Sequence, residues 1–179
     1  MKKLILALIV VCSFAGAKAQ NYQQTVKINP LSLFLATGNV SYERKVTENQ
    51  TFQLGAFYSG VKISGLRYSG FGFTPEYRFY FAGQKQAMNG VYAAPFARVQ
   101  SFTLKDVETK EKANYTSFGG GAILGWEKTW RSGFVLDLFV GPSFNNGKVK
   151  NTDNEDEFDV SAGFSGFGVR TGITLGFAF

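Results

Sequence analysis

The chain has 179 residues, of which 45% are hydrophobic and 16% aromatic, with 19 basic residues, 13 acidic residues, one cysteine and no histidine. This length suits a single domain. The lack of histidine excludes Ser-His-Asp catalysis and histidine-ligated metal sites, and a single cysteine excludes an intrachain disulfide.

The first segment, residues 1–19, has the three parts of a signal peptide. Two lysines make a basic start, Leu4–Ala15 is apolar, and Ala17-Lys18-Ala19 offers a cleavage site. The apolar run is shorter than the ~20 residues of a membrane-spanning helix. We therefore expect a mature domain of residues 20–179. Cleavage would remove the cysteine and three lysines, which lowers the net charge of +6 and leaves no basic cluster for nucleic acid.

The rest of the chain alternates bulky apolar residues with small or polar ones, which is the period-2 pattern of β-strands. We predict eight strands: Thr25–Ala36, Asn39–Val46, Thr51–Ile63, Phe71–Phe81, Gly90–Leu104, Tyr115–Lys128, Gly133–Phe144 and Gly166–Phe179. No apolar run after the signal peptide approaches the ~18 residues of a spanning helix. The expected fold is all-β, an eight-stranded antiparallel transmembrane up-and-down β-barrel.

An even number of strands brings both chain ends to one side, which the signal peptide and Phe179 suggest is the periplasm. The expected periplasmic turns are Thr47–Gln50, Ala82–Asn89 and Thr129–Ser132. The expected outer loops are Thr37-Gly38, Ser64–Tyr68, Lys105–Asn114 and Asn145–Ser165.

One face of the fourth strand and one face of the last strand carry bulky apolar side chains. A barrel in lipid turns such a face outward and keeps small and polar groups inside. The predicted lipid-facing residues are Phe71, Phe73, Tyr77, Phe79, Phe167, Val169, Ile173, Leu175 and Phe177. Aromatic residues near the expected periplasmic ends also predict an interfacial girdle, formed by Tyr80, Phe81, Trp126, Trp130, Phe177 and Phe179.

Charged residues recur on the opposite, inward face. They are Glu43, Glu76, Arg78, Arg98, Glu127, Asp137 and Arg170. An eight-stranded barrel is just wide enough for side chains to fill it, and charges there must be paired. We favour a salt-bridged network that closes the lumen over the alternative of an ion path or proton relay.

Three stretches resemble a family of small outer-membrane barrels of unknown function that is common in Bacteroidetes. They are Lys27-Ile28-Asn29-Pro30-Leu31, Ser41-Tyr42-Glu43-Arg44 and Gly72-Phe73-Thr74-Pro75-Glu76-Tyr77-Arg78-Phe79-Tyr80. The last strand, ending in Phe179, resembles the signal that the outer-membrane assembly machinery reads. In size and layout the chain is similar to barrels of the OmpA and OmpX type. The resemblance implies fold and location, and no reaction.

An acidic cluster lies in the last expected loop and comprises Asp153, Glu155, Asp156, Glu157 and Asp159. It lacks the central glycine and terminal glutamate of an EF-hand, so we interpret it as a solvated loop and expect no metal.

Gly119–Gly121 is not followed by the lysine and hydroxyl residue of a phosphate loop. We expect no cofactor.

These observations favour a non-catalytic outer-membrane barrel with a structural or surface-interaction role through its outer loops. The expected partners are outer-membrane lipid and lipopolysaccharide, the assembly machinery and an unidentified extracellular ligand, with no nucleic acid. Two alternatives remain: a narrow channel or small-ligand transport barrel, and a soluble secreted barrel of lipocalin type.

Overall fold

The computed structural model describes residues 22–63, 66–81, 87–106, 112–151, 157–159 and 165–179. The signal peptide predicted at residues 1–19 therefore lies outside the described residues. The elements are β1 Gln24–Ile28, α2 Pro30–Phe34, β2 Thr37–Thr47, β3 Gln50–Ile63, β4 Leu66–Tyr80, β5 Gly90–Asp106, β6 Lys112–Thr129, β7 Phe134–Asn151, β8 Glu157–Asp159 and β9 Gly166–Ala178.

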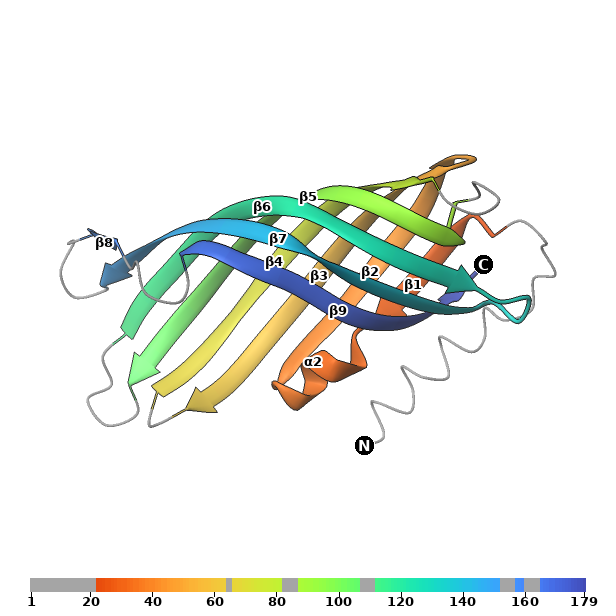
Figure 1. Ribbon diagram of the computed structural model, residues 1–179. Helices are drawn as coiled ribbons and strands as arrows, with labels where there is room; N and C mark the ends of the chain where they lie inside the picture. The colour runs from red at the N-terminus through yellow and green to blue at the C-terminus, as the bar shows by residue number, and fades with distance from the viewer. Residues whose placement is uncertain (1–21, 64–65, 82–86, 107–111, 152–156, 160–164) are drawn as a thin grey trace, which may run out of the picture.

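Eight of these strands form a closed antiparallel barrel (Figure 1). Each strand from β1 to β7 pairs with the next, β9 pairs with β7, and β1 closes the ring against β9. The short strand β8 pairs only with β7, on an extension beyond the ring. The predicted all-β fold of eight antiparallel strands is confirmed. Among the described residues, no helix is long and apolar enough to cross a membrane.

Both ends of the described chain lie at the same end of the barrel. The Gln24 amide donates to the Phe179 carbonyl over 3.0 Å, and the Phe179 amide donates back to Gln24 over 2.8 Å. The turns after β2 and β6 lie at this end too, since β3 begins at Gln50 and β7 at Phe134. We call the half of the barrel that contains the chain ends the terminal half, and the opposite half the loop half.

The alternation along each strand decides which side chains point inward. In β4, Thr74, Glu76 and Arg78 are buried, whereas Phe73 and Phe79 are exposed. Glycine gives room on the inner face where a large ring lies across the barrel. A Cβ atom added to Gly125 would meet a ring carbon of Tyr92 at 2.3 Å, so Tyr92 fills the interior only because its neighbour has no side chain.

The prediction of one strand over Thr25–Ala36 is wrong, because the chain leaves β1 at Ile28 and forms the short helix α2. The Asn29 side chain accepts hydrogen bonds from the amides of Leu31 and Ser32 at 3.1 and 3.2 Å, which caps the helix. Pro30 fits the first helical turn because its ring fixes φ and it has no amide hydrogen to donate.

The loop expected at Thr37-Gly38 is also absent. Both residues belong to β2, where they pair with Ser59 and Tyr58 of β3.

Strands in the loop half are longer than expected. β4 begins at Leu66, β5 ends at Asp106 and β6 begins at Lys112, so the loops Ser64–Tyr68 and Lys105–Asn114 are shorter than predicted.

The largest difference of this kind concerns the predicted loop Asn145–Ser165. Its first residues continue β7 to Asn151, although Asn-Asn-Gly is a turn-like sequence. Cross-strand pairing with β6 overrides this local preference, and the Tyr115 ring packs where a side chain on Gly147 would lie.

Candidate functional site

Five charged side chains converge inside the terminal half, from strands that are far apart in sequence. We call them the five-charge cluster: Lys27 of β1, Glu43 of β2, Arg78 of β4, Glu127 of β6 and Asp137 of β7. Each has at most 1% of its surface exposed. The barrel therefore brings two cations and three carboxylates into one buried site.

Each cation of the cluster contacts all three carboxylates. The Lys27 ammonium donates to Glu43, to Glu127 at 3.0 Å and to Asp137 at 3.1 Å. The Arg78 guanidinium lies 2.9 Å from Glu127, 2.9 Å from Asp137 and 3.4 Å from Glu43. Such shared pairing offsets the desolvation cost of buried ions, which is several kcal/mol for each unpaired charge.

Hydroxyl groups add further contacts to the carboxylates, although Glu127 Oε1 is buried without a hydrogen-bond partner among the described residues. The Tyr80 hydroxyl oxygen lies 2.9 Å from both Glu43 and Glu127, which share its single hydrogen, and Tyr92 donates to Asp137 at 2.7 Å. Thr51 donates to Glu43 at 2.5 Å. The Arg78 guanidinium also lies 4.4 Å from the centre of the Tyr92 ring, a cation–π contact. The cluster and the side chains of Thr51, Tyr80 and Tyr92 are all buried inside the barrel.

The carboxylates of this cluster face protein cations. Within the described residues, no group of three or more histidine, cysteine, aspartate or glutamate side chains is arranged to hold a metal ion. Lys27 and Arg78 take the positions between the carboxylates that a metal ion would need. The arrangement can therefore offset most of the buried negative charge and fix the strand register.

A second group of charges lies farther toward the loop half. We call Arg98 of β5 and Arg170 of β9 the arginine pair. Arg170 donates to one oxygen of Glu76 at 2.5 Å, and the other oxygen of Glu76 binds Arg78 at 3.2 Å. Glu76 thus links the two groups of charges, with one oxygen directed to each.

Arg98 has weaker partners than the other interior cations. Its Nε donates to the Thr74 hydroxyl at 3.3 Å, and its guanidinium lies 6.0 Å from the centre of the Phe96 ring. No carboxylate within the described residues forms a salt bridge with it. Arg170 lies over the same Phe96 ring at 4.4 Å, and the two like charges repel each other.

All seven charged residues predicted to face inward do lie inside the barrel. The structure brings six of them together directly or through Glu76: Glu43, Glu76, Arg78, Glu127, Asp137 and Arg170. Arg98 lies apart from the carboxylates.

Lys27 was missed, although the alternation Thr25, Lys27 against Val26, Ile28 would have placed it inward. Tyr92 was missed as well, because its partner Asp137 is distant in sequence. The assignment of Tyr80 to an interfacial girdle is wrong: this side chain is 1% exposed and donates into the five-charge cluster.

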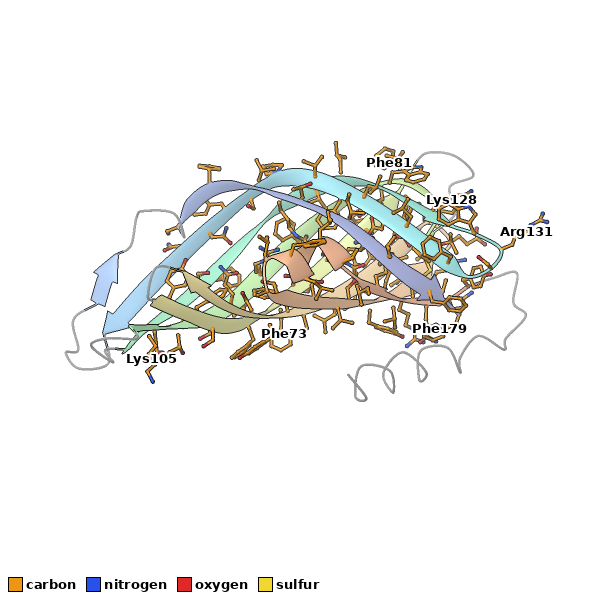
Figure 2. All side chains as sticks on the ribbon, turned by 90° about the horizontal axis from the view of Figure 1, so that it is seen from below. Phe73, Phe81, Lys105, Lys128, Arg131 and Phe179 are labelled. Atoms are coloured by element: carbon orange, nitrogen blue, oxygen red, sulfur yellow. The ribbon has the colours of Figure 1, made fainter. Side chains whose placement is uncertain are left out.

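The bulky apolar face of the strands points away from the interior, as Phe73 illustrates in Figure 2. Exposed fractions of the residues predicted to face lipid are 53% for Phe71, 49% for Phe73, 41% for Phe79, 91% for Phe167, 74% for Val169 and 40% for Ile173. Tyr77, Leu175 and Phe177 are partly exposed. Phe81 and Phe179 lie at the end of the barrel that also holds Arg131 (Figure 2).

The acidic cluster predicted in the last loop lies mostly outside the described residues, which exclude Asp153, Glu155 and Asp156. Glu157 and Asp159 are the ends of β8, whose backbone pairs with Lys150 and Lys148 of β7. Part of the segment expected to be a loop is therefore a strand.

Comparison with known proteins gives one match. A family model described as "Protein of unknown function (DUF3575)" matches residues 4–162. No curated protein and no solved structure matches.

Proposed function

We propose that this chain, which belongs to the DUF3575 family of proteins of unknown function, is a non-catalytic integral β-barrel of a Gram-negative outer membrane. Residues 1–19 direct export and are removed, and residues 20–179 form the barrel domain. The lumen is closed by the five-charge cluster. The barrel acts structurally or through contacts made by its outer loops.

The observation that carries this proposal is the distribution of polarity across the barrel wall. Ionic side chains are buried inside, whereas aromatic and aliphatic side chains are exposed around the outside. A soluble protein rarely exposes so many large apolar side chains to water around its surface. Hydrocarbon is the solvent that suits such an outer surface, and the resemblance to small Bacteroidetes outer-membrane barrels supports the same location.

Strand length supports membrane insertion as well. A tilted spanning strand needs ~9–11 residues, and β2 to β7 and β9 have between 11 and 18. The exposed rings of Trp126 and Trp130, near the chain-end side of the barrel, suit the interface between hydrocarbon and water. We place this side at the periplasm.

The burial and mutual pairing of the five-charge cluster support a closed lumen. An open water path needs space between the charged groups, whereas here each cation of the cluster contacts three carboxylates. The absence of histidine from the sequence supports a non-catalytic role. The partners that follow are membrane lipid and lipopolysaccharide, the assembly machinery that reads the strand ending in Phe179, and an extracellular ligand of the outer loops.

The membrane assignment is tested on the mature chain by fractionation and by gel migration before and after boiling. We expect carbonate-resistant, detergent-dependent material whose migration changes on boiling. Monodisperse protein in buffer without amphiphile would refute the proposal in favour of a soluble lipocalin-type barrel.

The closed lumen is tested by conductance in planar bilayers. We expect no stable open current from the unaltered protein, because the five-charge cluster fills the lumen. A reproducible open state would instead favour the channel alternative.

A further inference from the structure

The barrel wall has a notch beside β1. This strand pairs with β9 only from Thr25↔Ala178 to Ile28↔Leu175. β9 continues over Gly166–Thr174, where its other edge pairs with β7. Within the described residues, no strand pairs with this stretch on the β1 side, which leaves about 30 Å of strand edge without a strand partner.

Helix α2 lies next to this notch and is apolar. It forms part of the connection between β1 and β2, contacts both β2 and β9, and lies below β9 in Figure 1. Leu33 and Phe34 are 61% and 87% exposed, and none of the helix residues is buried. One border of the notch is therefore an apolar surface and the other an unpaired strand edge.

The arginine pair lies on the inner side of the same region. Arg170 belongs to the unpaired stretch of β9, and its side chain points inward to Glu76. Its side chain is 11% exposed, and its Nη1 is buried without a hydrogen-bond partner among the described residues. Arg98 of β5 donates to the Thr74 hydroxyl and lies near the Phe96 ring, and it forms no other hydrogen bond within the described residues. Glu76, the carboxylate that binds Arg170, also binds Arg78, and no salt bridge to Arg98 is found within the described residues.

We propose that the notch admits a single-chain anionic amphiphile, whose carboxylate or phosphate head binds between Arg98 and Arg170. The acyl chain leaves through the notch across α2. An anionic head supplies the acceptors that the Arg170 Nη1 and Arg98 lack and reduces the repulsion between them. An apolar chain can pack against the exposed leucine and phenylalanine side chains of α2. A free inorganic anion has no apolar surface to bury there. This inference rests on the proposed membrane location.

The test uses mature protein extracted from membranes into a neutral detergent, with native mass spectrometry to count adducts. Dodecanoate and dodecyl phosphate represent the two sources of the head group, a fatty acid and a phospholipid fragment. We expect one retained adduct of at least one of them, and none with dodecyltrimethylammonium or inorganic phosphate. Equal retention of the cationic amphiphile, or of inorganic phosphate, overturns the proposal.

Arg98→Gln is the matched variant, because it removes a guanidinium that makes no salt bridge with any residue that the structure describes. Loss of charge-assisted hydrogen bonds should weaken retention about tenfold or more. Lys105→Gln removes a charge from the same strand at the exposed far end (Figure 2) and should leave retention unchanged. Unchanged retention in Arg98→Gln overturns the head-group site. If that variant does not fold, the comparison of anionic with cationic amphiphiles on the unaltered protein decides.

The path of the chain is tested with a photoactivatable benzoylphenylalanine at Leu33, compared with the same group at Val99. Val99 is exposed on β5, four strands around the ring from β1. Labelled dodecanoate should crosslink strongly to the group at position 33. At position 99 its crosslinking should not exceed that of bulk lipid. Equal labelling overturns passage through the notch. Protein that inserts and folds without Arg98-dependent retention refutes this inference alone, whereas monodisperse protein in plain buffer refutes the proposed function and the inference with it.

Discussion

The two halves of the barrel interior differ in how their charges are partnered. In the terminal half, Lys27 and Arg78 each contact three carboxylates, and every strand has a neighbour on both sides. In the loop half, Arg170 binds Glu76, whereas Arg98 forms no salt bridge and the stretch Gly166–Thr174 of β9 has no strand partner on its β1 side within the described residues. The charges of the terminal half are therefore paired more completely than those of the loop half, which is where we propose the amphiphile to bind.

The largest effect is expected for Arg78→Met. This change leaves three buried carboxylates with Lys27 as their remaining cation, and breaking a buried ion network in this way costs about 3–5 kcal/mol. Urea titration in detergent micelles measures this loss as a decrease in the free energy of unfolding. Arg44→Met is the control, because Arg44 is exposed on β2 and should change stability by no more than about 0.5 kcal/mol. Equal losses in the two variants would contradict the role of the cluster.

The next effect concerns the hydroxyl groups around the cluster. Tyr92→Phe removes the donor 2.7 Å from Asp137, and a hydrogen bond to a buried charged group contributes about 1.5–3 kcal/mol. Tyr77→Phe removes a 2.8 Å bond to Gln50 at a partly buried position and should cost about 1 kcal/mol or less. The same urea titration compares them, and a larger loss for Tyr77→Phe would show that the Tyr92 hydroxyl adds little.

A third comparison contrasts packing in the two halves. A Cβ on Gly125 would lie 2.3 Å from the Tyr92 ring, so Gly125→Ala should cost about 1–3 kcal/mol through overpacking. In the loop half, a Cβ on Gly168 meets only the Ser143 Oγ at 3.3 Å, a group that can move. Thermal unfolding, monitored by the gel shift, should show a lower transition temperature for Gly125→Ala and an unchanged one for Gly168→Ala. A similar decrease for both alanine variants would mean that the loop half is packed as tightly.

The smallest effect is expected for Arg98→Met. Arg98 makes no salt bridge within the part of the chain that the structure describes, and its removal relieves repulsion with Arg170. Stability should change by less than about 1 kcal/mol in urea titration. A loss as large as that of Arg78→Met would place Arg98 in the stabilising network and remove the distinction between the halves.

Much of the site could be predicted because alternation along a strand is a local property. In β4, Thr74, Glu76 and Arg78 point to one face and Phe73 and Phe79 to the other, because successive side chains of a strand alternate. Lys27 follows the same rule within β1. Asn29 and Pro30 also form a local helix-start signal, so the end of β1 could have been predicted from the sequence.

The amino-acid sequence by itself determined the number of strands in the ring, the two faces of each strand and the set of charges on the inner face. The tertiary structure decided which charges meet, because Lys27 and Asp137 are 110 residues apart and come together only through the register of the closed ring. It also decided where the ring stays open. The notch beside β9 depends on the early end of β1 and on the stagger of the strands around the barrel, and no single strand encodes that stagger.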